Sequence, residues 1–336
     1  PTVEEAIERL RQSHSLETPA SCWGPTSSGR WRWAVDAGAW HPDGGTQGAE
    51  FEFLLSLLPD EASRRAVLAH PAKEDKKRAL LGQLLFRRAC ARASGVEEYS
   101  GLTVGRTRGG KPFLEGPLPG GLPNFNFNVS HDGRWVVLAS DSLRLVGADV
   151  AAPARARGDR EDDVWFEDLG ELLFDSERLL IQAEPCVRRR YGVFQRLWSA
   201  KEALTKAVGQ GLDFGMSRIE VELEPAEAIA SSQAECRATL GPVRAELSID
   251  AWRRAEWDVE QHRLPGDHWV SVALGPVEQA VDADGRFAAT FRSPGVDDPA
   301  RRLAKLEAAP GFEFLRVRDL VPERRAVDYA AARDSG

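Results

Sequence analysis

The sequence predicts an α+β protein built from two similar halves, each an antiparallel sheet packed with helices. The chain of 336 residues is long enough for two domains of ordinary size. Each half runs in the same order through a strand, helices, one long helix, a hairpin region and a closing strand. The closing strands also match locally, since Trp135-Val136-Val137-Leu138-Ala139 resembles Trp269-Val270-Ser271-Val272-Ala273. We therefore expect an internal duplication with its boundary near 141–143, and a ligand site between the halves.

The first half contains one helix with a strong pattern, at 73–94. Its leucines, among them Leu80 and Leu84, have helical spacing, and Gly95 follows as a left-handed cap. Shorter helices are expected at 51–58 and 60–68, and strands at 32–38, 125–129 and 134–139, with Ser130 and His131 at the end of the second strand. The last two strands are joined by a tight turn at Asp132-Gly133.

A turn rich in glycine and cations lies between the long helix and these strands, at 104–113. Gly105, Gly110 and Lys111 have the spacing of a phosphate-binding P-loop. Pro112 stands where that loop needs Ser or Thr to bind Mg²⁺, so a P-loop enzyme is rejected. The turn is either a cradle of backbone amides and cations for a phosphate or a flexible basic hairpin.

The second half is organised around a helix at 194–208 that ends at a glycine-rich segment. Lys201 falls on its apolar stripe, while Glu202 and Lys206 are four residues apart and therefore neighbours on its surface. Such a pair is commonly no more than a solvated ion pair. The functional interpretation gains weight from an aspartate upstream.

That aspartate is Asp149, near the end of an expected buried strand at 145–150. A buried aspartate needs a partner. Oxygen ligands from two separate elements can hold Mg²⁺, which keeps several waters and takes further ligands from substrate phosphates. The sequence thus suggests a magnesium site between the strand and the helix.

The remaining segments complete a second sheet and a tail. An acidic amphipathic segment is expected at 164–180, and antiparallel strands are expected at 219–223, 245–249, 255–259 and 268–274. In the tail we expect helices at 297–308 and 326–333 and a strand at 312–317. The predicted organisation is an N-terminal extension (1–28), an N-terminal lobe (29–142), a C-terminal lobe (143–276) and a C-terminal tail (277–336).

Composition argues against several classes of protein. A net charge of −8 argues against a general nucleic-acid binder, because the phosphate backbone requires a basic surface. No apolar run approaches the ~20 residues that span a bilayer, so we expect no membrane segment. The spacing of the four cysteines and six histidines argues against zinc and disulfides and for free thiols. We expect a cytoplasmic location, with an organellar one left open.

Five motifs together resemble the 4′-phosphopantetheinyl transferase superfamily, most closely its monomeric two-lobed branch. They are Arg106-Thr107 with Gly110-Lys111-Pro112, PNFNFNVSH (Pro123 to His131), VGADV (Val146 to Val150), FDSE (Phe174 to Glu177) and WSAKEALTKAVGQGL (Trp198 to Leu212). The similarity runs from about Trp31 to Pro276. It implies a two-lobed fold with pseudo-twofold symmetry.

The resemblance also implies an activity. Such an enzyme transfers the 4′-phosphopantetheine arm of coenzyme A to a serine of an apo acyl or peptidyl carrier protein and releases 3′,5′-ADP. Coenzyme A is then a substrate, Mg²⁺ a cofactor and an acidic carrier protein the partner. A monomer and a role in fatty acid or polyketide biosynthesis are further implications.

The residues of the site follow from the same resemblance. Asp149 and Glu202 are implied to bind Mg²⁺, and Glu202, Lys206 and Asp149 to carry the reaction. Glu202 would take the serine proton directly or through water, and Lys206 would stabilise developing charge. The residues implied to bind coenzyme A are Arg64, Arg106, Thr107, Arg108, Gly109, Gly110, Lys111, Asn128, Val129, Ser130, His131, Lys201, Glu202 and Lys206. Among them, His131 is expected at the 3′-phosphate.

The chain departs from the family pattern at one position. Many members carry a second acid two residues after the metal-binding aspartate, and this chain has Ala151 there. Either water fills that place or Mg²⁺ binds more weakly.

Two other classes of function remain open. A different Mg²⁺-dependent nucleotide transferase would use the same acids and cations but prefer ATP to coenzyme A. A non-catalytic coenzyme A binding protein would not need Glu202, so the intact set of Asp149, Glu202 and Lys206 argues against it. For a carrier protein the candidate docking runs are Arg87-Arg88 and Arg188-Arg189-Arg190, with an ordinary solvated face as the alternative.

Overall fold

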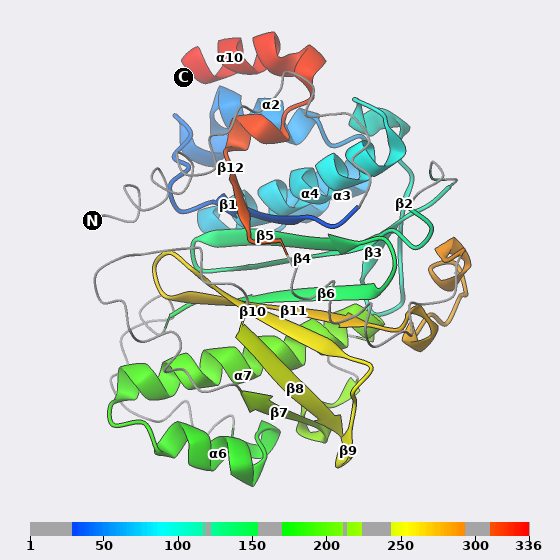
Figure 1. Cartoon of the computed structure of the whole chain (residues 1–336). Coiled ribbons are helices and arrows are strands. Elements are labelled where there is room, and N and C mark those ends of the chain that lie inside the picture. Colours follow the sequence, from blue (N-terminus) through cyan, green and yellow to red (C-terminus); the bar gives the residue numbers. More distant parts are fainter. Residues whose placement is uncertain are drawn as a thin grey trace.

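The computed structural model describes residues 29–116, 118, 122–153, 170–210, 214–223, 243–292 and 310–335. In these residues two large sheets lie face to face, and helices cover the outer face of each (Figure 1). Mixed helices and mainly antiparallel strands confirm the predicted α+β class. Among the described residues, no helix is long and apolar enough to cross a membrane.

The first sheet has the strand order β12-β1-β5-β4. Its strands are β1 (Arg32–Asp36), β4 (Asn126–Asp132), β5 (Trp135–Asp141) and β12 (Glu313–Leu315). β1, β5 and β4 are antiparallel neighbours, whereas β12 joins β1 in parallel. The tail segment at 313–315 therefore extends the sheet formed by the first half of the chain.

Four helices of the described residues cover the outer side of this sheet. They are α2 (Ala49–Ser56), α3 (Glu61–Leu68), α4 (Lys73–Ser94) and α10 (Ala326–Asp334). α4 packs directly on the strands, α3 packs on α4, and α10 packs on α2. α4 has the predicted bounds and ends at Gly95, which adopts the left-handed conformation with φ 68°. Leu80 and Leu84 are fully buried in the core between α4 and the sheet.

The second sheet has the order β6-β11-β10-β8-β7, with β9 paired to β8. Its strands are β6 (Leu145–Ala151), β7 (Ile219–Leu223), β8 (Val243–Ile249), β9 (Trp252–Arg253), β10 (Asp258–Leu264) and β11 (His268–Gly275). The helices α6 (Asp175–Gln182) and α7 (Val187–Val208) cover its outer face (Figure 1). α7 ends at Gly209, again in the left-handed conformation, as predicted.

A two-stranded hairpin joins the halves, and short 3₁₀ turns connect the larger elements. The hairpin consists of β2 (Val104–Arg106) and β3 (Pro112–Leu114). The 3₁₀ turns are Gly45–Gln47, Tyr99–Gly101, Gly170–Leu172, Met216–Arg218, Val277–Gln279, Ala288–Thr290, Val317–Leu320 and Glu323–Arg325.

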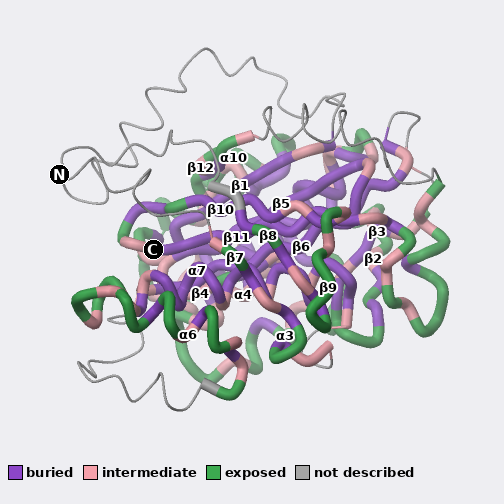
Figure 2. Tube along the Cα trace, turned by 60° about the horizontal axis from the view of Figure 1, so that its bottom comes forward, coloured by how far each residue is buried: buried purple, intermediate pink, exposed green. Residues whose placement is uncertain are grey.

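A separate apolar core lies between the two sheets. Trp135 and Val137 of β5 face Val270 and Val272 of β11 across it, and all four are fully buried. Figure 2 shows the strands β1, β5, β6 and β11 buried along the middle of the molecule, with exposed stretches on α3, α6 and β9. The sheets are thus joined by apolar packing over their inner faces.

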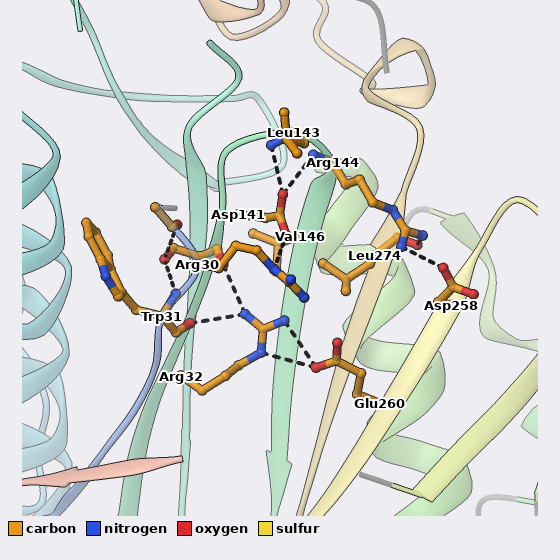
Figure 3. Close-up of polar contacts among 12 residues, drawn as sticks. Arg30, Trp31, Arg32, Asp141, Leu143, Arg144, Val146, Asp258, Glu260 and Leu274 are labelled. Atoms are coloured by element: carbon orange, nitrogen blue, oxygen red, sulfur yellow. Dashed lines mark hydrogen bonds and ion pairs between the residues drawn. The ribbon is translucent and has the colours of Figure 1, made fainter. Parts of the chain in front are cut away.

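A buried ion pair also joins the sheets (Figure 3). Arg32 of β1 donates through Nε and Nη2 to Glu260 Oε2 of β10, at 3.2 and 3.1 Å. The remaining guanidinium nitrogen donates to the carbonyl oxygens of Trp31 and Ser140. Burial disfavours the charge of Glu260, but Arg32 and His262 outweigh it and lower the pKa of this carboxyl to about 2. The pair therefore stays ionised at neutral pH.

Some predicted boundaries were wrong. The strand expected at 255–259 begins at Asp258, because 255–257 belong to the turn that follows the short strand β9. The acidic amphipathic segment expected at 164–180 contains the turn at 170–172 and most of α6, while 164–169 and the helix expected at 297–308 lie outside the described residues. Cys90 and Cys186 are free thiols, as predicted.

Candidate active site

Three charged side chains meet where β6 lies against α7. Lys206 Nζ is 2.5 Å from Asp149 Oδ1 and 4.0 Å from Glu202 Oε2. Asp149 belongs to β6, whereas Glu202 and Lys206 lie one turn apart on α7. The structure thus brings together the two acids and the lysine that the sequence singled out.

Gly147 allows the strand and the helix to come this close. A Cβ atom on Gly147 would lie 1.9 Å from the carbonyl oxygen of Ala203 and 2.4 Å from the amide nitrogen of Ala207. Only glycine therefore lets the backbone of β6 touch the backbone of α7. Residues two apart in a strand point to the same face, so Asp149 also points towards α7.

The pKa values of this cluster are shifted by burial and by the neighbouring charges. Burial raises the pKa of Glu202, Lys206 opposes that shift, and Asp149 raises the pKa further. Burial would lower the pKa of Lys206, but Asp149 and Glu202 outweigh it and leave this pKa raised. Lys206 therefore stays protonated at neutral pH, while Glu202 is a stronger base than an ordinary glutamate.

The donor chemistry of the cluster fits Mg²⁺. Asp149 and Glu202 supply carboxylate oxygens, and the repulsion between their charges is one that a divalent cation would relieve. Two carboxylates are enough for Mg²⁺, because this ion keeps waters and takes phosphate oxygens. In the described part of the chain, no group of three or more His, Cys, Asp or Glu side chains could hold a metal. Ala151 offers no side-chain ligand and pairs with Trp269 in the sheet.

Ser130 on β4 connects this cluster to the first sheet. Its hydroxyl group donates to Asp149 Oδ1 at 2.8 Å and accepts from Lys206 Nζ at 3.1 Å. Asn128, two residues earlier, accepts the backbone N–H of Ala148 through Oδ1 at 2.9 Å. Ser130 therefore touches the charged cluster, whereas Asn128 binds the strand that carries Asp149.

His131 lies beside the same cluster, among positive groups. The side chain of His131 is exposed, yet desolvation lowers its pKa, Arg78, Lys206 and His70 lower it further, and the neighbouring Asp132 opposes them. Val129, on the same face of β4, packs against the core of the first half. The surroundings of His131 therefore suit an anion, whereas Val129 has a packing role.

Sequence analysis missed Arg78 and His70. Arg78 is anchored to the turn after His131, since its Nη1 donates to Gly133 O at 2.6 Å. It also pairs with Asp75 on its own helix, at 2.5 Å. No motif contains either residue, because they come from α4 and the loop before it and meet His131 only in the folded chain.

The glycine-rich turn docks on the C-terminal end of α7. Thr107 Oγ1 donates to Gly209 O at 3.3 Å, and Lys111 Nζ donates to Val146 O at 2.5 Å and to Lys206 O at 3.1 Å. Burial lowers the pKa of Lys111 to about 7. Carbonyl oxygens at the end of a helix favour a cation. The prediction that Lys111 cradles a phosphate finds no support here, because the structure turns its side chain inward to link the halves.

The other residues of this turn remain at the surface. Arg106, Arg108, Gly109 and Gly110 are exposed, and Arg106 Nη1 donates to Gly110 O at 3.0 Å. Gly109 lies against α7, since a Cβ atom there would be 2.1 Å from the carbonyl oxygen of Gly209.

Arg64 on α3 is bound to its own neighbourhood. It donates to Glu61 Oε2 at 3.1 Å and to Leu58 O at 2.5 Å. Its side chain is partly exposed, so it keeps a surface that a ligand can reach. No contact in the described residues joins it to the cluster at Asp149.

Lys201 lies apart from the charged cluster, and its contact with coenzyme A stays a prediction. It is buried, and its Nζ donates to Glu177 Oε2 at 2.6 Å and to Leu172 O at 2.8 Å. Glu177 Oε1 in turn accepts the backbone N–H of Val221 at 2.8 Å. Lys201 thus fastens α6 and β7 to α7. The reason is visible in the sequence, since Lys201 falls on the apolar stripe that faces inward.

The run Arg87-Arg88 is also buried, so the interpretation as a docking surface or a solvated face was wrong. Arg87 pairs with Asp60 at 3.0 Å. Arg88 lies over the Trp33 ring and donates to the Asp319 carbonyl oxygen. Both guanidinium groups stabilise the first half instead.

Comparisons with known proteins identify the family of the chain. Residues 38–143 match a family model described as 4′-phosphopantetheinyl transferase, N-terminal, and residues 145–272 match the 4′-phosphopantetheinyl transferase superfamily. Asp149, Glu202 and Lys206 all lie in the second match.

Curated relatives carry corresponding names. The L-aminoadipate-semialdehyde dehydrogenase-phosphopantetheinyl transferase of Homo sapiens is 30% identical over 259 residues, which cover 75% of this chain and 77% of the relative. The phosphopantetheinyl transferase of Thraustochytrium is 30% identical over 264 residues, covering 76% of this chain and 82% of the relative. The 4′-phosphopantetheinyl transferase of Bacillus subtilis is 33% identical over 154 residues, which cover 45% of this chain and 61% of the relative. The chain therefore belongs to the 4′-phosphopantetheinyl transferase superfamily, the enzymes that transfer phosphopantetheine to carrier proteins.

Proposed function

We propose that this chain transfers the 4′-phosphopantetheine arm of coenzyme A to a serine of an apo acyl or peptidyl carrier protein and releases 3′,5′-ADP. The observation that carries this proposal is the meeting of Asp149, Glu202 and Lys206 at the contact of β6 and α7. A protonated lysine beside two carboxylates suits phosphoryl transfer, which depends on positioning and on stabilising charge.

In the reaction, the serine oxygen attacks the β-phosphorus of coenzyme A, and the bond from that phosphorus to the bridging oxygen breaks. Glu202 takes the serine proton directly or through water, because its carboxylate stands in the cluster beside Lys206. Lys206 keeps its charge and donates hydrogen bonds to oxygens on which negative charge develops. When bound by Asp149 and Glu202, Mg²⁺ would supply further positive charge at the diphosphate. The leaving group is 3′,5′-ADP.

The substrate site proposed for coenzyme A is smaller than the set implied by resemblance. It includes His131 together with Arg78 and His70, both of which lower the pKa of His131 and are proposed to favour the 3′-phosphate there. Arg64, Arg106 and Arg108 are at least partly exposed and remain proposed contacts of the nucleotide part. Lys111, Val129 and Lys201 are left out because they are engaged in packing and internal hydrogen bonds.

Further proposals concern assembly and partner. We propose two lobes with pseudo-twofold symmetry, a monomeric enzyme in the cytoplasm, an acidic carrier protein and a role in fatty acid or polyketide biosynthesis. Arg188 to Arg190 lie in the first turn of α7, about 24 to 27 Å along the helix from Lys206 at 1.5 Å per residue. We propose that they contact a part of the carrier protein remote from its serine. An acidic carrier should bind more weakly as salt is raised.

Replacing Glu202 with glutamine should leave coenzyme A binding nearly unchanged and lower kcat by about 10² to 10⁴-fold. The variant keeps the shape of the side chain but removes a base and a ligand charge. Calorimetry would measure coenzyme A affinity, and single-turnover kinetics would measure transfer. A variant that loses only affinity would assign Glu202 to binding and not to proton transfer.

Replacing His131 with alanine should weaken coenzyme A binding by roughly 10- to 150-fold, because hydrogen bonds to charged groups contribute about 1.5 to 3 kcal/mol. The comparison ligand is dephospho-coenzyme A, which lacks the 3′-phosphate. Its affinity should change little in the variant. Equal losses for the two ligands would remove His131 from the 3′-phosphate site.

The proposed reaction is tested by its second product. Chromatography of a reaction with coenzyme A, Mg²⁺ and an apo carrier protein should show one 3′,5′-ADP for each carrier protein modified. Release of 3′,5′-ADP without a modified carrier would indicate hydrolysis of coenzyme A and contradict transfer.

A further inference from the structure

Every second side chain of β4 binds the backbone of β6. β4 is an edge strand of the first sheet, and β6 is an edge strand of the second. Asn126 Oδ1, Asn128 Oδ1 and Asp132 Oδ2 accept the N–H groups of Val146, Ala148 and Ala152, each at 2.9 Å, and Ser130 Oγ lies 3.4 Å from the Val150 nitrogen. Each pair is separated by 20 residues in the sequence. We call this set the side-chain ladder.

The ladder supplies hydrogen-bond acceptors to the edge of β6, whose N–H groups would otherwise be buried without partners. β6 pairs with β11 on one side, and its alternate N–H groups point the other way. Val146, Ala148, Val150 and Ala152 are buried, so water cannot replace the missing partners. A buried N–H without a partner costs about 1 to 3 kcal/mol. Short polar side chains on β4 supply acceptors where a backbone strand is absent.

The ladder also sets the position of the reacting cluster. Its third rung, Ser130, donates to Asp149 Oδ1 and accepts from Lys206 Nζ. The second rung, Asn128, holds the N–H of Ala148, the residue directly before Asp149. A shift of β6 along β4 would therefore separate Asp149 from Ser130.

We propose that Asn128 is a positioning residue: by fixing the backbone before Asp149, it sets where the Asp149 carboxylate stands relative to Lys206. Resting on the proposed function, this assignment competes with the implied role of Asn128 as a coenzyme A contact. The two roles differ in what they predict, because positioning affects kcat and a ligand contact affects affinity.

Asn128→Ala should lower kcat by about 10- to 100-fold, since a misplacement of about 1 Å can cost 10²-fold. Coenzyme A affinity, measured by calorimetry, should stay within about 2-fold. The Ala148 amide should lose protection in hydrogen exchange, because its acceptor is gone. The exchange measurement does not depend on activity, so it tests the ladder even if the proposed transfer reaction were wrong.

Asn128→Asp is the conservative variant, because it keeps an acceptor oxygen at the same place. Asp132 already acts as a rung through a carboxylate. Protection of Ala148 and most of kcat should return in this variant. If Asn128 instead binds the diphosphate of coenzyme A, the added negative charge should weaken coenzyme A binding below that of Asn128→Ala.

Asn126→Ala is the control, because it removes a rung two residues farther from Asp149. It also removes the hydrogen bonds from Asn126 Nδ2 to the carbonyl oxygens of Asn124 and Arg144, so it is the harsher change to the fold. It should expose the Val146 amide to exchange and lower kcat less than Asn128→Ala does. An equal loss of kcat in the two variants would overturn the assignment to Asn128. So would a fall in coenzyme A affinity with unchanged kcat, or full protection of Ala148 in Asn128→Ala.

Discussion

Asp149→Asn should abolish transfer, with a loss of about 10³-fold or more. The substitution keeps the shape of the side chain and an acceptor for Ser130. It removes the charge that holds Lys206 and would bind Mg²⁺ together with Glu202. Ala151 leaves no carboxylate two residues on to replace it. The measurement is the rate of modification of an apo carrier protein, followed by intact mass over a range of Mg²⁺ concentrations.

The control for this experiment is Glu222→Gln, which changes an exposed acid on β7, the opposite edge of the same sheet. Thermal denaturation of both variants would show that each is folded. Full activity of Asp149→Asn at an ordinary Mg²⁺ concentration would contradict the assignment of Asp149 to Mg²⁺ binding and to holding Lys206.

Glu260→Ala should destabilise the fold by about 3 to 5 kcal/mol. Both side chains of the Arg32–Glu260 pair are buried between the two sheets, with exposed fractions of 0% and 1%. Removing one partner leaves a charge in a place that water cannot reach. Urea denaturation would measure the loss. The double variant Arg32→Met with Glu260→Met should recover most of it, because replacing a whole buried pair by apolar side chains is often neutral.

The matched control is Glu246→Ala, which removes an exposed partner of Arg253. It should lower the free energy of unfolding far less. Acid titration gives an independent check. Because the pKa of Glu260 is lowered to about 2, its contribution is full above about pH 4.5 and is lost as pH falls towards 2. A cost for Glu260→Ala no larger than that for Glu246→Ala would contradict this account of how the sheets are joined.

Local patterns were enough to predict the elements that carry the site. α4 and α7 have strong helical periodicity and end at Gly95 and Gly209, where φ is positive. Alternation in the β4 segment predicted a strand, and the small residues around Asp149 predicted a buried strand. The meeting of Asp149, Glu202 and Lys206 followed from the motifs together and not from any one of them.

Burial decided several cases among the charged residues. Lys111 belongs to a motif rich in glycine and cations, yet folding turns its side chain inward onto carbonyl oxygens. The inward position of Lys201 was visible in the apolar stripe of its helix, but its partner Glu177 was not. The strand at 313–315 could not be placed, because its partner β1 is about 280 residues away in the sequence. Arg78 was missed for the same reason, since its neighbour His131 lies on another element.

The side-chain ladder shows a further limit of prediction from the sequence. The alternation of asparagine and phenylalanine predicts a strand with one polar face, and a polar face is ordinarily expected to meet water or a ligand. Here Asn126 and Asn128 meet the backbone of a strand from the other sheet. Nothing in the sequence distinguishes these possibilities, because the acceptor groups are the same in each.

The central claim is that this chain modifies a carrier protein with the phosphopantetheine arm of coenzyme A. It is tested most directly by the intact mass of an apo carrier protein after incubation with the enzyme and Mg²⁺, with either coenzyme A or ATP as donor. We predict a mass increase of one phosphopantetheine group with coenzyme A, none with ATP, and none when the acceptor serine is alanine. An unchanged mass with coenzyme A, or an increase with ATP alone, would contradict the account.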